Sequence, residues 1–302
     1  MKEYFLDPFK PNFSNFIEQL MQLNDNVKQY IRNDVARVPS SIEENYATLL
    51  SKEELSEQGE DLDAIYSKLA YYSQGLIRWN HPGALINVNP PASIPSTAVS
   101  SYFSLFSPNG AQDMSTGYLL TTELAVVKML SQLADIDYKQ SGGYFTFGGK
   151  STNIHAIKHG LQRISKDYGT YGIRDDVVTF SSTQGHPCHA EACNWLGIGD
   201  KNCIRISTNK MGEINLEELE NSMSAALEQG KKVACITLNG GTTIQMTIDP
   251  IKKVVDIRDR LVKKYELDYI PRIHIDSVIG WVWLFFKNYD FATNPLNFSG
   301  KA

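Results

Sequence analysis

The sequence predicts an α/β protein in which a mostly parallel sheet is covered by helices and preceded by a helical N-terminal segment. Two observations predict this class. From residue 144 onward, short apolar runs typical of buried strands alternate with segments of helical periodicity, whereas residues 1–80 carry helix signals alone. Alternating strands and helices imply parallel strands joined by helical crossovers. We therefore expect a helical arm over 1–80 and a sheet domain over 81–302.

The helical arm is predicted from two stretches in which a serine precedes a glutamate by three residues, the spacing of a capping box. Ser41 with Glu44 and Ser51 with Glu54 have this spacing. Residues 81–118 are then rich in Pro, Ser, Asn and Gly, and so long a loop is usually functional. A helix with one apolar face is expected from about Thr122 onward.

The sheet domain is predicted from four apolar runs, which we expect to be strands. They lie at 177–180, 203–206, 233–238 and 273–275. Helices are expected between and before them, beginning near Asn153, over 190–196, after Asn215 and after Asp249-Pro250. Asn and Asp are good N-terminal caps, and proline is favoured in the first turn of a helix.

Composition excludes several classes of partner. The 302 residues carry a net charge of -5, which gives no reason to expect nucleic acid. The longest apolar run, 279–286, is much shorter than the about 18 residues of a membrane span, and the N-terminus lacks the apolar core of a secretory signal. Four cysteines form no disulfide framework and are typical of a reducing compartment. We expect a cytoplasmic protein.

The segment Gly148-Gly149-Lys150-Ser151 lies between an apolar run and a helical segment. Glycines allow a ligand to approach the backbone, and the free N–H groups of a helix start favour an anion. The sequence therefore predicts a phosphate site here, although a glycine-rich turn without a ligand has the same composition. A Walker A loop is not expected, because its first glycine would fall on Tyr144.

Polar residues follow the predicted strands at their carboxyl ends, where ligands bind in open α/β sheets. They lie at 181–186, at 240–243 and at Asp276. We expect them to converge with the glycine loop on one crevice. A carboxylate such as Asp276 can bind a metal, act as a base or hold a protonated ring nitrogen. The nearby group Cys188, His189, Glu191 and Cys193 lacks the spacing of a structural zinc site, so we expect no metal, and His189 is interpreted as structural.

Together these motifs resemble the group II pyridoxal-phosphate-dependent decarboxylases, the family of the glutamate and aromatic amino acid decarboxylases. The resemblance covers residues 144–153, 181–187, 237–250 and 274–276, in the same order, within roughly residues 80 to 280. It implies a fold type I (aspartate aminotransferase-like) large domain, the cofactor pyridoxal 5'-phosphate, a homodimer and decarboxylation of an amino acid.

The resemblance also implies roles for single residues. His186 would stack on the cofactor ring and Asp276 would pair with its pyridinium nitrogen, so these two are the expected catalytic residues. His81 and the loop after it would help to shape the substrate pocket. The expected cofactor-binding residues are Gly148, Gly149, Lys150, Ser151, His186, Thr242 or Thr243, Asp276 and Ser277.

The sequence departs from the family pattern at four places, one of which is the extra Asn239-Gly240 before the Gly-Thr-Thr motif. Lys150 stands where members commonly have a small uncharged residue, and Asp276-Ser277-Val278 replaces Asp-Ala-Ala. No His-Lys pair follows Asp276, and only Lys287 and Lys301 lie downstream. We therefore expect a fragment that lacks the Schiff-base lysine and the small C-terminal domain, and that is inactive alone.

Two other functions fit the same residues. One is a carbon–carbon lyase or desulfurase that uses the same fold and cofactor, because a fold does not fix a reaction. The other is a catalytically silent protein that keeps the fold for binding or dimerisation.

Overall fold

The computed structural model describes residues 5–7, 9, 12–41, 45–51, 53–55, 57–84, 89–110, 113–290 and 292–293. The chain forms two compact units, unit 1 (Met1–Gly117) and unit 2 (Tyr118–Ala302). This boundary lies after residue 81, where the Pro-, Ser-, Asn- and Gly-rich stretch begins. The reason is that a helix at Ile94–Ser104 lines a groove together with the first helix of unit 1.

Unit 1 is helical, as predicted for its first part. It contains α1 (Phe13–Lys28), α2 (Tyr46–Leu50), α3 (Leu62–Tyr72), α4 (Ile94–Ser104) and α5 (Asp113–Thr116). The capping box predicted at Ser51 is wrong, because Ser51 is the C-terminal cap of α2. Asn45 caps the start of α2 instead, its side chain accepting from the Thr48 N–H at 3.0 Å. Glu44, the partner predicted for Ser41, lies outside the described residues.

Unit 2 is built on a four-stranded parallel sheet. Its strands are β1 (Val177–Ser182), β2 (Cys203–Ile206), β3 (Lys232–Asn239) and β4 (Arg272–Asp276), in the order β2-β1-β3-β4. The four predicted strands and the predicted fold class are thus confirmed. Because all strands are parallel, their carboxyl ends lie at one edge of the sheet.

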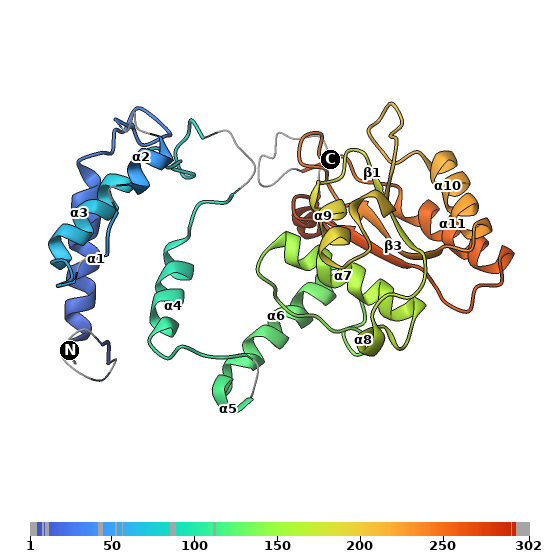
Figure 1. The fold of residues 1–302 in the computed structure, drawn as a ribbon, viewed down its shortest axis with the longest axis horizontal. Helices are drawn as coiled ribbons and strands as arrows, with labels where there is room; N and C mark the ends of the chain where they lie inside the picture. Colours follow the sequence, from blue (N-terminus) through green and yellow to red (C-terminus); the bar gives the residue numbers. More distant parts are fainter. Residues whose placement is uncertain are drawn as a thin grey trace. The chain divides into compact units, whose positions relative to one another are not determined.

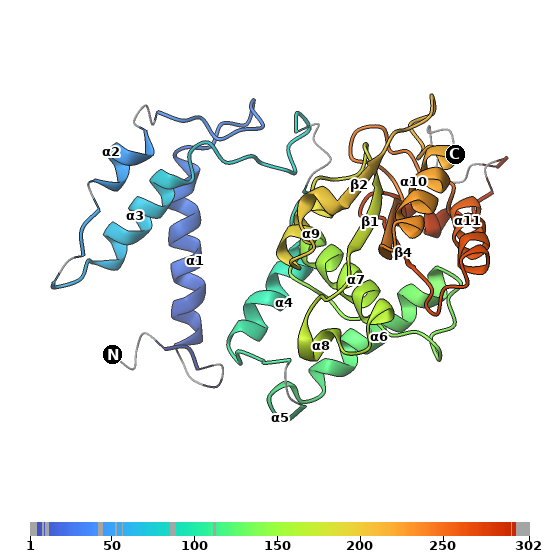
Figure 2. The ribbon, with the colours of Figure 1, turned by 45° about the vertical axis from the view of Figure 1, so that its right-hand side comes forward.

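Helices cover both faces of the sheet (Figure 1 and Figure 2). On one face, α10 (Leu216–Glu228) and α11 (Ile251–Lys264) pack on a core that includes Phe180, Ile236 and Leu238. On the other face, α7 (Gly149–Ile164) and α9 (Cys188–Trp195) form a second core with the sheet. Gly160 brings α7 directly onto β3, since a Cβ there would lie 2.3 Å from the Ala234 carbonyl oxygen. The remaining helices of unit 2 are α6 (Leu119–Leu133), α8 (Tyr168–Tyr171), η2 (Asp200–Asn202) and η3 (Gly280–Phe286).

The two predicted helix starts in this region differ in outcome. Asn215 caps α10 as expected, accepting from the N–H groups of Glu217 and Glu218. Asp249 makes no side-chain cap of α11. Its buried carboxylate instead accepts from the N–H groups of Ile214 and Asn239, each at 2.7 Å. This aspartate therefore fastens the end of β3 to the segment before α10.

Among the described residues, no helix combines the length and apolar character that crossing a membrane requires.

Candidate functional site

The carboxyl edge of the sheet brings together the predicted polar segments of unit 2. Asp276 is the last residue of β4, and its side chain is 15% exposed. The Gly240 N–H after β3 donates to the Asp276 carbonyl at 2.7 Å. Ser181, near the end of β1, reaches Asp276 through one intervening histidine. The predicted convergence on one edge is therefore present in the structure.

Asn153 joins the glycine loop to Asp276. Its side-chain N–H group donates to the Gly149 carbonyl at 3.0 Å and to Asp276 Oδ2 at 3.1 Å. Asn153 lies one turn into α7 and is 2% exposed. It was not among the predicted site residues, although it belongs to the motif that begins at Gly148. Its spacing, one helical turn after the glycine whose carbonyl it binds, is the signal that a sequence reading could have used.

His189 is the second residue that the sequence reading missed as part of the site. Its Nε2 lies 3.0 Å from Asp276 Oδ2, and its Nδ1 lies 2.7 Å from Ser181 Oγ. The ring is 1% exposed. The interpretation of His189 as structural followed from its sequence alone, which does not show that α9 and β4 meet.

The Asp276 carboxylate is held in its charged form. Burial alone would raise the pKa of Asp276, but hydrogen bonds from His189 and Asn153 outweigh that effect and lower the pKa to about 2. Burial lowers the pKa of the neighbouring His274 to about 4. At neutral pH the site therefore presents one negative charge beside a neutral imidazole.

The glycine loop opens α7 in the way an anion site requires. Gly148 is the N-cap residue of α7 and has a φ of +91°, a conformation that favours glycine. A Cβ on Gly148 would meet nothing within 4 Å, whereas one on Gly149 would lie 3.6 Å from the Val278 side chain. The loop thus lies beside the segment that follows Asp276. Ser151 is in the first turn of α7 and half-buried.

Lys150 is turned toward α9. Its ammonium group forms an ion pair with Glu191, and both side chains are about half exposed, at 54% and 47%. The hydrogen bond that Lys150 donates to Glu191 raises the pKa of Lys150, so the lysine stays charged. A cation is therefore present at the rim of the glycine loop, and Glu191 competes with any anion for it.

The other predicted residues of unit 2 lie around the same edge. His186 is exposed, and its Nδ1 accepts from the Cys188 N–H at 3.1 Å. Thr242 is buried, and its hydroxyl accepts from the Thr247 N–H at 3.1 Å, whereas Thr243 is exposed. The Ser277 hydroxyl donates to the Gly240 carbonyl at 3.0 Å and so ties β4 to the loop after β3.

Cys188, His189 and Asp276 place three potential metal-ligand atoms within 4.8 Å of one another. Burial raises the pKa of the Cys188 thiol to about 11. A protonated thiol is a poor ligand, because metals bind the thiolate. The His189 N–H already donates to the carboxylate, so we interpret the three groups as a hydrogen-bonded cluster.

Three further residues bear on the predicted site. His81 lies in unit 1, where its Nε2 is 3.0 Å from the Asn33 carbonyl and its Nδ1 accepts from the Gly83 N–H. Lys287, the first lysine after Asp276, donates to Asp135 at 2.6 Å. Lys301 lies outside the described residues.

The arrangement defines a class of ligand. A helix N-terminus with a glycine pair suits a phosphate, and an ionised carboxylate suits a protonated ring nitrogen. Between them, the buried Asn153 Oδ1 has no hydrogen-bond partner among the described residues. Pyridoxal 5'-phosphate carries both a phosphate and a pyridine nitrogen, so the residues present fit it. The fold and the site therefore define an α/β protein built for a phosphorylated pyridine cofactor.

Comparison with known families agrees with this class. Residues 45–287 match the family described as the pyridoxal-dependent decarboxylase conserved domain. The match spans most of the chain, which therefore belongs to this family. The predicted family and the predicted cofactor, pyridoxal 5'-phosphate, are confirmed.

Individual relatives are distant. The acidic amino acid decarboxylase GADL1 of Xenopus tropicalis is 27% identical over 179 residues, which are 59% of this chain and 33% of that protein. The glutamate decarboxylase domain of a Vibrio parahaemolyticus diaminobutyrate-pyruvate transaminase and L-2,4-diaminobutyrate decarboxylase has a TM-score of 0.79 at 18% identity, covering 95% of this chain and 62% of that one. Mouse CSAD in its apo form has a TM-score of 0.76 at 18% identity, covering 91% and 57%. The chain thus spans about a third of the GADL1 relative.

Proposed function

We propose that this protein contributes the cofactor-binding half of an active site that decarboxylates an amino acid. The observation that carries the proposal is the Asp276 carboxylate, ionised and linked through Asn153 to the glycine loop at the start of α7. Membership of the decarboxylase family supports the reaction, and the chain's own residues support the cofactor site.

Each residue has a distinct task in this proposal. The N–H groups at Gly149, Lys150 and Ser151 and the Lys150 ammonium bind the phosphate. Asp276 binds and keeps a proton on the ring nitrogen, and the exposed His186 ring offers a face for stacking. Pyridoxal phosphate supplies an electron sink that stabilises the carbanion left when carbon dioxide departs. His81, Thr242 or Thr243, and Ser277 remain proposed contacts for substrate or cofactor.

The reaction is tested with the protein expressed from its complete gene. We expect it to release carbon dioxide from an amino acid when pyridoxal phosphate is supplied. Asp276→Asn should lower kcat by roughly tenfold to a hundredfold, since it removes a charged hydrogen bond. The control Asp256→Asn removes an exposed carboxylate of α11, whose partner is Lys252, and should leave kcat unchanged.

Two outcomes separate the alternatives. Turnover of amino acids without carbon dioxide release would favour a carbon–carbon lyase or desulfurase. Cofactor binding without any turnover would favour a silent binding protein.

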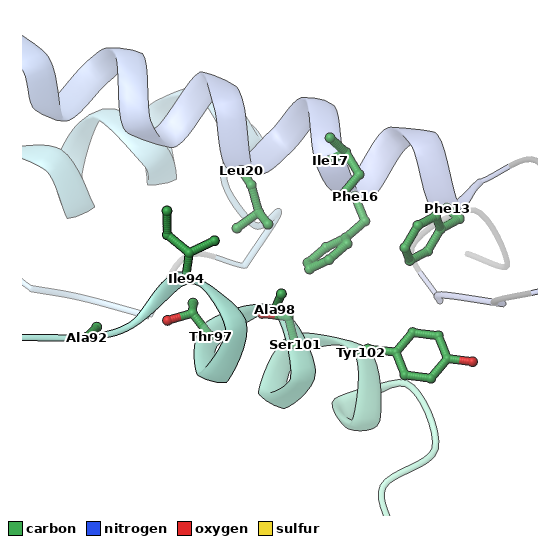
Figure 3. A pocket seen from close by; sticks show the side chains of 10 residues that line it. All are labelled: Phe13, Phe16, Ile17, Leu20, Ala92, Ile94, Thr97, Ala98, Ser101 and Tyr102. Carbon is green, nitrogen blue, oxygen red and sulfur yellow. The ribbon is translucent and has the colours of Figure 1, made fainter.

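We also propose a homodimer in the cytoplasm. The helices α1, α4 and α6 bury none of their residues within the chain. In unit 1, α1 and α4 line an apolar groove of about 640 Å³. Figure 3 shows Phe16 and Leu20 of α1 facing Ile94 and Ala98 of α4 across it. A second copy of the chain is the partner we propose for these faces. Four free and buried cysteines support a reducing compartment.

A further inference from the structure

His189 forms the centre of a buried polar chain that runs from the surface of β2 to the cofactor site. Arg205 on β2 donates to Ser181 Oγ at 3.1 Å, Ser181 Oγ lies 2.7 Å from His189 Nδ1, and His189 Nε2 lies 3.0 Å from Asp276 Oδ2. Ser181 is 0% exposed and His189 is 1% exposed. Ser181 and His189, which water does not reach, thus find their hydrogen-bond partners inside the protein.

The geometry fixes which imidazole nitrogen carries the proton. Arg205 is always a donor, so it occupies a lone pair of Ser181 Oγ and leaves the hydroxyl proton for another acceptor. Two acceptors are in range, His189 Nδ1 at 2.7 Å and the Ser182 carbonyl at 3.4 Å. The shorter contact makes Nδ1 the acceptor. The ring proton then sits on Nε2, where it donates to the Asp276 carboxylate.

The surrounding backbone is shaped to hold this contact. A Cβ on Gly185 would lie 2.9 Å from His189 Nδ1 and 3.0 Å from Ser181 Oγ, so a larger residue would push the ring away from the hydroxyl. Arg205 also donates to the Gly185 carbonyl at 2.6 Å.

We propose that His189 is a positioning residue of the cofactor site: its ring, held as the Nε2–H tautomer, orients the Asp276 carboxylate and keeps it ionised to receive the ring nitrogen. This role rests on the proposed cofactor site. Both His189 and Asn153 donate to the same oxygen of Asp276, Oδ2. The other titratable groups facing the carboxylate are Cys188 from α9 and His274 from β4. Both are neutral at pH 7, so neither replaces the hydrogen bond from His189.

The first test measures the ionisation of the Asp276 carboxyl directly, in the absence of cofactor. In the 302-residue chain with ¹³C-labelled aspartate carboxyls, the Asp276 signal should show an ionised group at every pH from 8 down to 4.5. In His189→Leu the burial cost is no longer balanced, and the signal should titrate at a higher pH than in the unmodified chain. His189→Gln retains an N–H donor and should restore most of the difference. Nitrogen shifts of ¹⁵N-labelled histidine should show the Nε2–H tautomer at His189, and Ser181→Ala should weaken that preference.

The second test reads ligand binding with pyridoxamine 5'-phosphate, which needs no lysine for attachment. His189→Leu should bind it about tenfold more weakly, and as the pH is lowered its affinity should fall at a higher pH than that of the unmodified chain. His189→Gln should bind nearly as well as the unmodified chain. The control His159→Leu, which changes an exposed histidine, should not differ from the unmodified chain. Equal losses in the Leu and Gln variants, or an Asp276 titration that His189→Leu leaves in place, would overturn the role of His189. If the unmodified chain binds no pyridoxamine phosphate, the proposed cofactor site fails, while the carboxyl titration still decides the role of His189.

Discussion

A histidine two residues before Asp276 makes unit 2 sensitive to acid. His274 has a buried Nε2 with no hydrogen-bond partner among the described residues, and burial lowers its pKa from 6.5 to about 4. Between these two values the unfolded chain binds a proton that the folded chain does not. Stability is therefore fully present above pH 6.5 and is lost as the pH falls toward 4.

We expect the free energy of unfolding of unit 2, measured in urea, to fall over this range by up to about 1.4 kcal/mol per pH unit from this residue. His274→Leu should flatten that slope. His159→Leu, which changes an exposed histidine of α7, should retain it. If the Leu variant at 274 kept the full slope, the acid sensitivity would belong to other groups.

Asp276 contributes to acid sensitivity only at lower pH. Its pKa is about 2 in the folded chain and 3.8 in the unfolded chain, so its stabilisation is lost as the pH falls below 3.8.

At the scale of elements, the ion pair between Lys150 of α7 and Glu191 of α9 sets the charge at the mouth of the phosphate site. Glu191 neutralises a cation that a phosphate would otherwise meet. Glu191→Gln should therefore tighten the binding of pyridoxamine 5'-phosphate a few-fold, and Lys150→Gln should weaken it a few-fold. Titration calorimetry at two salt concentrations measures both. The changes should shrink at high salt, because both side chains are half exposed. A Glu191→Gln variant that bound more weakly would show that the pair holds the loop in shape instead.

Elements that depend on local signals were predictable from the sequence. The β-strands were visible as short apolar runs, and Asn215 caps α10 through N–H groups only two and three residues away. Asp249 has the same local signal at the start of α11, yet its carboxylate binds Asn239 and Ile214. Ile214 is 35 residues away in the chain, so this choice follows from the meeting of β3 with the segment before α10.

The same reasoning explains the outcome at the site. Gly148, Gly149 and Asp276 were predictable because a loop before a helix and a residue at a strand end have fixed positions in an α/β fold. Asn153 and His189 act on Asp276 across 123 and 87 residues. Their roles arise only when α7, α9 and β4 share one edge of the sheet.

At the scale of the whole molecule, the two units differ in how much they bury. Unit 2 has two cores, one on each face of its sheet. In unit 1, Val38 and Ala70 are the only buried residues among those described. Ile17 and Leu20 of α1 and Ile94 of α4 are 42%, 46% and 87% exposed. Apolar faces of this kind are typical of a surface that a partner covers.

A second copy of the chain is the partner that we propose for the groove between α1 and α4, and solution mass tests it. Light scattering after size-exclusion chromatography should give twice the 33.9 kDa of one chain.

Covering one such side chain contributes about 1.5–3 kcal/mol, so placing a charge at Leu20 or Ile94 removes that gain and adds the cost of burying a carboxylate. The double variant Leu20→Glu with Ile94→Glu should therefore run as one chain at micromolar concentration, while Glu18→Gln on α1 should leave the mass doubled. Since unit 2 keeps both of its cores, the double variant should retain the urea unfolding transition of unit 2. A doubled mass in the double variant would place the contact between copies elsewhere, with the exposed face of α6 as the next surface to change.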